Sequence, residues 1–239
     1  MVLCLYSVQT FLCVVKQTLL DSSLQLESAH PHEPIIVSQV PEPWQCLGVG
    51  NYAAVFVHPQ QGDWVVKVYA HHFQEVAQEA SVYRQLGKHP AYSELIAEGD
   101  TFLVLKRLYG VTLYDAVHQG SLIPERVITD ITCALAYAQE RGLNPFDVHG
   151  KNVMMQNGQG FVVDISDFYK EGYDPKWEHL RKAYYCFYRP IIYRMRLSVP
   201  YWLLDMTRYI YRQCRKLGYL IQQIRKPLSS RVNRSVLKE

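Results

Sequence analysis

Residues 146–168 decide the fold, and they read FDVHGKNVMMQNGQGFVVDISDF. Two short apolar runs flank Asn157-Gly158, the dipeptide that best tolerates the positive φ angles of a type I′ turn, so this stretch predicts a β-hairpin. Asn152 enters the hairpin and Asp164 leaves it, so both side chains should lie at one end, near Asp147. Carboxylate and amide oxygens grouped in this way suit Mg²⁺ and a phosphoryl donor. The alternative is a surface hairpin with ordinary turn residues.

The region upstream predicts a second hairpin that carries a glycine pair and one lysine. Two runs rich in Val, Ala and aromatic residues flank a turn expected at residues 60–63. Gly48 and Gly50 precede the first run, where a bare backbone can approach phosphate oxygens. Lys67 is the only charged residue in WVVKVY, and its burial requires an anionic partner. In this order, ahead of the hairpin that ends at Asp164, these features favour a phosphate-binding site.

These motifs resemble those of the protein kinase-like superfamily, and specifically its small bacterial serine/threonine protein kinases. Residues 48–55 resemble the glycine-rich loop G-x-G-x-x-G-x-V, with Ala53 in place of the third glycine, and VVKVY resembles the V-A-I-K strand. PFDVHGKN is similar to the catalytic loop H-R-D-x-x-x-x-N, and DIS stands where the superfamily has D-F-G. The resemblance covers about residues 42–170.

The resemblance implies ATP and Mg²⁺ as cofactors and assigns a role to each matching residue. Asp147 would be the catalytic base, Lys67 would hold the phosphates, and Asn152 and Asp164 would bind Mg²⁺. The positions implied for nucleotide binding are Gly48, Val49, Gly50, Asn51, Tyr52, Ala53, Val55, Lys67, Glu79, Lys106 and Leu108.

The helix expected over residues 73–86 should supply the anionic partner of Lys67. Glu75 and Glu79 are four residues apart and therefore share a helix face. We prefer Glu79, which lies in mid-helix, and keep Glu75 as the alternative. The following strand, TFLVLKRL, would end at an interlobe hinge near Lys106 to Leu108, where the resemblance implies backbone hydrogen bonds to adenine.

Departures from the kinase pattern matter as much as the matches. Pro145-Phe146 replace the His-Arg pair, and the missing Arg is the residue that binds a phosphorylated activation loop. No A-P-E sequence follows Asp164, so we do not expect activation-loop phosphorylation to act as a switch. The lysine that many serine/threonine kinases have two residues after the base is His149 here. Lys151 could supply this missing cation near the γ-phosphate, or it could face solvent.

Three functions remain open at this stage. The first is an ATP-dependent kinase that phosphorylates a hydroxyl acceptor, with Ser or Thr of a protein preferred. The second is a small-molecule phosphotransferase, because DVHGKN also resembles the D-L-H-x-x-N loop of aminoglycoside and choline phosphotransferases. The third is a nucleotide-binding pseudokinase, ranked last because the lysine, base and metal positions are all present.

Length and composition are consistent with a two-lobed α+β protein. The chain has 239 residues and is 49% hydrophobic, enough for a substantial core. We expect a protein kinase-like domain over residues 35–226, with an antiparallel β-sheet N-lobe and one main helix at 35–104 and a mostly helical, shortened C-lobe at 109–226. Residues 1–34 should form an amphipathic helix and a linker, and residues 227–239 a basic flexible tail.

Charge and cysteine usage bear on partners and compartment. From residue 176 onward there are 15 Lys and Arg residues against three Asp and Glu. This basic, aromatic end favours either a solvated helical surface, with much of its aromatic content in the core, or an anionic surface or acidic partner. No nucleic-acid motif, transmembrane span or secretory signal is expected. Six scattered cysteines without a C-x-x-C pair indicate a cytoplasmic protein, with peripheral membrane contact as an option.

Overall fold

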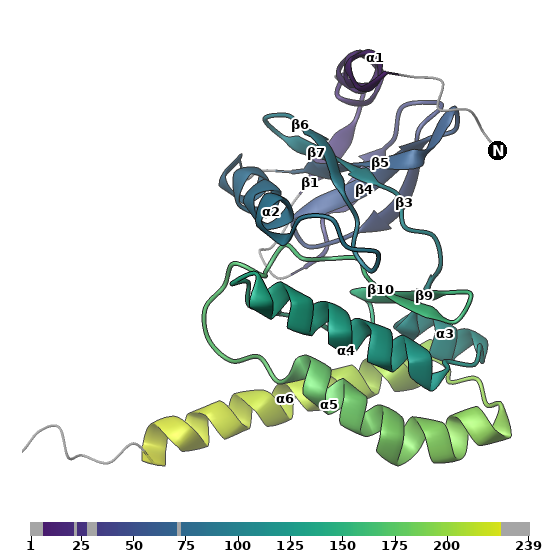
Figure 1. Cartoon of the computed structure of the whole chain (residues 1–239), viewed down its shortest axis with the longest axis vertical. Helices are drawn as coiled ribbons and strands as arrows, with labels where there is room; N and C mark the ends of the chain where they lie inside the picture. The colour runs from purple at the N-terminus through teal and green to yellow at the C-terminus, as the bar shows by residue number, and fades with distance from the viewer. Residues whose placement is uncertain (1–6, 22, 28–32, 71–72, 226–239) are drawn as a thin grey trace, which may run out of the picture.

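The computed structural model describes residues 7–21, 23–27, 33–70 and 73–225, with side chains up to residue 216, and it shows two lobes (Figure 1). A β-rich lobe with the main helix α2 (Phe73–Leu86) lies above a mostly helical lobe. The predicted α+β, two-lobed architecture is therefore confirmed. The expected tail at 227–239 lies outside the described residues.

The N-lobe is built on a five-stranded antiparallel sheet of order β3-β4-β5-β7-β6. Its strands are β3 (Gln45–Val49), β4 (Ala53–His58), β5 (Gln61–Tyr69), β6 (Leu95–Glu98) and β7 (Phe102–Lys106). The β4–β5 turn falls at residues 59–60, earlier than predicted. The reason is that Gln61 is 2% exposed and already pairs with His58 in the ladder.

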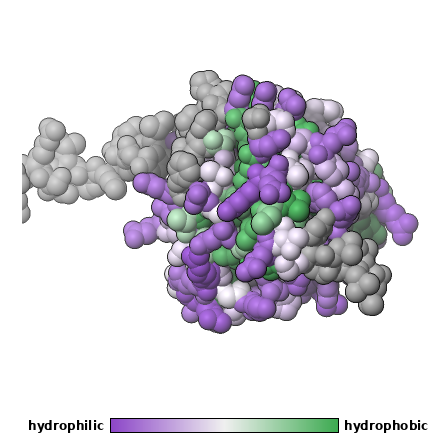
Figure 2. All heavy atoms as spheres, turned by 90° about the horizontal axis from the view of Figure 1, so that it is seen from above, coloured by the Kyte–Doolittle hydropathy of each residue, from purple (hydrophilic) through white to green (hydrophobic). Residues whose placement is uncertain are grey.

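The N-terminal segment completes the N-lobe core. Helix α1 (Val8–Val14) continues into a π-helical turn, η1 (Val15–Leu19), and the pair caps the sheet from above. Phe11 and Leu19 are fully buried in a cluster with Trp44 and Phe56. Strand β1 (Gln25–Glu27) pairs with β2 (Ile36–Gln39), so part of the expected linker is a strand. Seen from above, hydrophobic surface shows between hydrophilic side chains on this lobe (Figure 2).

The C-lobe places the predicted hairpin against a long helix. Strands β9 (Val153–Gln156) and β10 (Gln159–Val162) join β8 (Val111–Thr112) in a small sheet beside α4 (Glu125–Glu140). Asn157 and Gly158 have φ angles of 51° and 73°, as the predicted turn requires. Gly160 allows the close approach, because a Cβ there would lie 2.5 Å from the Val127 carbonyl oxygen.

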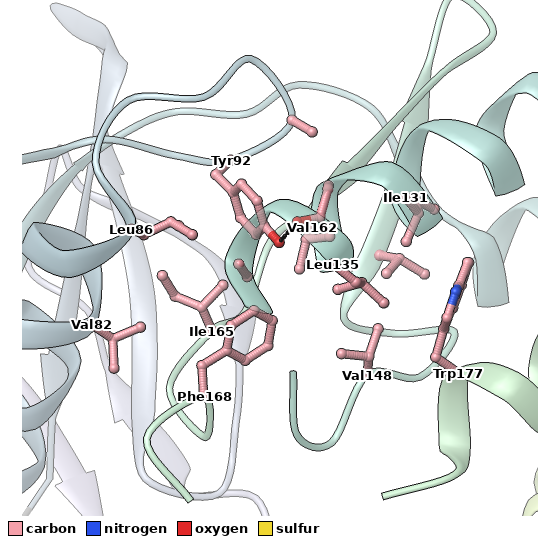
Figure 3. Close-up of a cluster of buried hydrophobic side chains, with 14 of the residues drawn as sticks. Val82, Leu86, Tyr92, Ile131, Leu135, Val148, Val162, Ile165, Phe168 and Trp177 are labelled. Carbon is pink, nitrogen blue, oxygen red and sulfur yellow. Dashed lines mark hydrogen bonds between the residues drawn. The ribbon is translucent and has the colours of Figure 1, made fainter. Parts of the chain in front are cut away.

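One continuous apolar cluster joins the two lobes behind the site (Figure 3). Val82 and Leu86 of α2 lie on one side, and Leu135 of α4 lies on the other. Ile165 and Phe168, which follow Asp164, are each 1% exposed within this cluster. The segment after Asp164 is therefore anchored by buried apolar side chains, which fixes the point where Asp164 leaves the hairpin.

The remaining helices are α3 (Leu113–Gln119), α5 (Lys176–Ala183), the π-helix η2 (Tyr184–Tyr193) and α6 (Tyr201–Arg225). The expectation that much of the aromatic basic end is core is wrong. Of the side chains described from residue 176 on, Trp177, Tyr184 and Tyr188 are buried hydrophobics, whereas Trp202 of α6 is 66% exposed. Polar contacts and the stacking of Tyr201 on Tyr114 and His118 hold α6 instead, and its apolar stripe faces outward. None of the helices in the described ranges is long and apolar enough to cross a membrane.

Candidate active site

Lys67 lies at the centre of the site, and its side chain makes two ion pairs. It projects from β5, and its Nζ lies 2.9 and 2.8 Å from the two carboxylate oxygens of Glu79 on α2. The Tyr69 hydroxyl donates a short hydrogen bond to the same carboxylate, which is 1% exposed. Between the two candidates left by the sequence, Glu79 is the carboxylate that contacts Lys67, and Glu75 lies on the wall of the same cleft.

Asp164 brings the C-lobe to the same lysine. Its Oδ1 lies 3.4 Å from Lys67 Nζ and accepts a hydrogen bond from the Ser166 amide at 3.1 Å. Burial raises the pKa of the Asp164 carboxyl, but Lys67 and the Ser166 hydrogen bonds outweigh burial and hold this pKa below its usual range. Burial lowers the pKa of Lys67, but the carboxylates of Asp164 and Glu79 together raise it by more than burial lowers it. The ammonium therefore stays protonated. A cation and an anion thus face each other across the lobes.

The catalytic-loop residues are held by backbone contacts. Asp147 lies in the loop between α4 and β9 with φ at 60°, a left-handed conformation that a non-glycine residue adopts at a cost. The Asn152 side-chain amide donates to the Asp147 carbonyl oxygen at 3.1 Å. The Val163 amide donates to the Asn152 carbonyl oxygen at 3.0 Å, which closes the hairpin and brings Asn152 beside Asp164, as the sequence predicted.

The glycine-rich segment forms the roof of a cleft lined by Gly50, Asn51, Tyr52, Ala53, Lys67 and Asp164, among others. The Gly50 amide donates to the Ala53 carbonyl oxygen at 2.8 Å, so the loop closes as a tight turn. Gly48 and Val49 are the last residues of β3, outside the cleft lining. Val55 is opposite Lys67 in the β4–β5 ladder.

The expected hinge is only partly available to a base. The Lys106 amide donates to the Glu94 carbonyl oxygen at 2.9 Å, and the Arg107 amide donates to the Asp63 carbonyl oxygen at 2.7 Å. Neither N–H can therefore bind adenine. Leu108 is half-buried, and within the ranges that the structure describes its amide makes no hydrogen bond, so it remains the candidate from this segment.

Two residues that the sequence did not single out lie at the catalytic loop. The Lys176 ammonium makes a short hydrogen bond to Asp147 Oδ1, and the Asp147 amide donates to Asp174 Oδ2 at 3.0 Å. Lys151, the cation expected near the γ-phosphate, instead has its Nζ 4.3 Å from the centroid of the Tyr114 ring. Asp147 and Lys176 are 29 positions apart in the sequence, and so long a separation gives no local pattern that could have shown this contact.

Comparisons with known proteins agree with this geometry. No family model matches the chain. Over 180 residues it is 27% identical to "Putative serine/threonine-protein kinase YrzF" of Bacillus subtilis (strain 168), covering 74% of this chain and 83% of that protein. The chain is kinase-like. The predicted resemblance to the protein kinase-like superfamily is thereby confirmed.

Among solved structures, part of the chain matches the co-crystal structure of WbdD with the kinase inhibitor LY294002. The TM-score is 0.42 and the identity 20%, over 54% of the kinase-like chain. The chain spans 33% of that larger protein.

The oxygen donors of the kinase-like site fit a magnesium nucleotide. Within the described residues, no group of three or more His, Cys, Asp or Glu side chains could hold a metal ion. The donors at hand are the Asp164 carboxylate and the Asn152 amide oxygen, on adjacent ends of one hairpin. Mg²⁺ is commonly bound by one or two protein oxygens together with substrate phosphates, so this sparse donor set suits Mg²⁺ bound with ATP.

The Lys67–Glu79 pair yields a prediction about stability. Glu79→Gln removes the closer of the two carboxylates that pair with the buried Lys67 ammonium, so we expect a loss of about 3 kcal/mol in the free energy of unfolding, measured by urea denaturation. Glu75→Gln, four residues away on the same helix, is the matched control and should cost clearly less. Equal losses for the two variants would show that the Lys67 contact does not stabilise the fold.

Proposed function

We propose that the chain is an ATP-dependent kinase that transfers the γ-phosphoryl group to a hydroxyl acceptor, namely Ser or Thr of a protein. The observation that carries this proposal is the contact of Lys67 with both Glu79 and Asp164. It joins the N-lobe sheet, α2 and the hairpin end in the arrangement that protein kinases need in order to position ATP phosphates. The kinase named as a sequence relative supports the same class of reaction.

Each residue of the site has a task in this reaction. The loop from Gly50 to Ala53 covers the phosphates, and Lys67 binds them. Asn152 and Asp164 would hold Mg²⁺, which would supply positive charge to the phosphates. Asp147 orients the acceptor hydroxyl and accepts its proton. Because phosphoryl transfer depends mainly on positioning and electrostatics, this small set is sufficient.

The charges around the catalytic loop favour an acidic acceptor over a cationic one. Burial lowers the pKa of Lys151 most, and the nearby Arg208 and Arg212 of α6 lower it as well. Lys176 and Arg208 act on His149 in the same direction. Asp205 and Asp115 act on Lys151, and Asp147 and Asp164 act on His149, in the opposite direction. The preference therefore rests on the excess of Lys and Arg over Asp and Glu from residue 176 onward, which would repel an aminoglycoside or choline. A protein segment with acidic residues is therefore preferred over a cationic small molecule.

Exposed side chains of α6, η2 and the residues between them also favour an anionic partner, in this case a membrane surface. Large apolar side chains point outward in a region rich in arginine; they include Phe187, Ile191, Met195, Trp202, Met206, Tyr209 and Ile210. Apolar anchors beside cations suit an anionic membrane surface in the cytoplasm. Reversing the charges of Arg212 and Lys216 should weaken sedimentation with phosphatidylserine vesicles, and raising the salt concentration should have the same effect. Binding that responds to neither change would leave this face as plain solvated surface.

The site predicts loss of activity in two variants. Lys67→Ala and Asp164→Asn should each lower phosphoryl transfer to dephosphorylated casein roughly 10³-fold or more, because each removes a charge that acts on the phosphates. Radiolabelled ATP with Mg²⁺ measures the transfer, and circular dichroism checks folding. Wild-type protein that binds ATP but transfers nothing would identify a pseudokinase instead.

A further prediction concerns regulation. The segment after Asp164 is already held without phosphate, because the Asn144 side-chain amide donates to the carbonyl oxygens of Lys170 and Gly172 at 2.7 and 2.8 Å. Lys170 also pairs with Asp167 at 2.7 Å. Phosphatase treatment of freshly purified protein should therefore leave activity unchanged. A loss of activity that autophosphorylation of residues 165–175 restores would contradict this expectation.

A further inference from the structure

The Asp147 carboxylate contacts a cation that comes from helix α5 of the C-lobe. Lys176 is the first residue of α5, and its Nζ contacts Asp147 Oδ1 through a short hydrogen bond. The same ammonium lies 3.2 Å from Asp174 Oδ2. The Lys176 side chain is 25% exposed and that of Asp147 is 32% exposed, so this contact is partly shielded from solvent.

Neither of the two other basic side chains near the loop, Lys151 and His149, makes this close contact with Asp147. Lys151 Nζ lies over the Tyr114 ring. His149 Nε2 is 3.8 Å from Asp147 Oδ1, which is well beyond the contact that the Lys176 ammonium makes with the same oxygen. In the described part of the chain, Lys176 is therefore the charged side chain that pairs with Asp147.

Asp174 fixes the lysine and the base together. Its carboxylate is 1% exposed and accepts hydrogen bonds from the Asp147 amide at 3.0 Å and the Lys176 amide at 3.3 Å. Arg215 of α6 donates to it from Nη1 at 3.2 Å. A buried carboxylate with this many donors is rigidly placed, and it holds both the left-handed backbone of Asp147 and the ammonium that Asp147 contacts.

We propose that Lys176 is the positioning residue of the catalytic base, held by Asp174 and through it by Arg215 of α6. This inference rests on the proposed kinase function. In the transfer, the acceptor O–H bond breaks and its proton moves to the Asp147 carboxylate. The acceptor oxygen bonds to the γ-phosphorus, and the electron pair of the broken P–O bond leaves with the β-phosphate oxygen of ADP. With Oδ1 bound by Lys176, the other carboxylate oxygen of Asp147 is directed to the acceptor.

The experiment compares five proteins: wild type, Lys176→Met, Lys176→Arg, Lys151→Ala and Lys182→Ala. Steady-state transfer to dephosphorylated casein gives kcat and the KM for ATP, and thermal unfolding gives Tm. Lys176→Met keeps the length of the side chain without its charge, so kcat should fall roughly 100-fold while the KM for ATP stays the same. Lys176→Arg should recover part of kcat. Lys182 is an exposed lysine on the same helix, and Lys182→Ala should match wild type.

Three results would overturn the inference. One is an unchanged kcat in Lys176→Met. Another is a raised kcat, which would show that Lys176 blocks the acceptor position. The third is a kcat loss in Lys151→Ala with none in Lys176→Met, which would assign the cation to Lys151. If Lys176→Met unfolds at a much lower Tm, Arg215→Ala tests the same chain of contacts and should lower kcat less, with the KM for ATP unchanged.

Lys67→Ala separates this inference from the proposed function. If wild type and Lys67→Ala show the same background transfer, the kinase assignment fails and the role of Lys176 fails with it. If wild type far exceeds Lys67→Ala but equals Lys176→Met, the kinase assignment stands and only the role of Lys176 is wrong.

Discussion

The burial of one ammonium group determines how the two lobes meet. Lys67 is a central-strand residue with a side chain only 14% exposed, and such a charge is tolerated only with anionic partners at contact distance. One partner, Glu79, comes from α2 and so fixes that helix against the sheet. The other, Asp164, comes from the C-lobe and so fixes the hairpin end. The electrostatic requirement of a single lysine thereby places the three elements that line the cleft.

The apolar core makes this arrangement durable. The cluster that runs from α2 through Ile165 and Phe168 to α4 is continuous across the lobes. It holds the residues on both sides of Asp164 in place, so the position of Asp164 relative to Lys67 does not depend on their ion pair alone. On the other face of the sheet, α1 and η1 seal a second cluster around Phe11. Strand β5 is therefore packed on both faces, which keeps Lys67 on a rigid element.

The sequence predicted features that depend on neighbours in the chain. The Asn157-Gly158 turn, the apolar runs around it and the helical spacing of Glu79 all follow from local rules, and the structure contains each of them. Features that depend on distant partners were not predictable in this way. Lys176 looks like any helix-opening lysine until the fold sets it beside Asp147. Likewise, the aromatic and apolar content of an arginine-rich helix predicts that it packs in the core. In the structure, the contacts of α6 with the rest of the C-lobe leave its apolar stripe facing outward.

The link between Arg215 and Asp174 has a consequence for synthesis. Domains fold as units, with N-terminal parts first, as a chain leaves the ribosome. The sheet that carries Lys67 is complete once residue 106 has emerged, and α2 can dock on it then. The carboxylate that steadies the catalytic loop obtains its last donor more than a hundred residues later, from α6. A nascent chain therefore completes the lobe that carries Lys67 well before the loop around Asp147 is fully braced, so the order of synthesis delays assembly of the whole site until the C-lobe is in place.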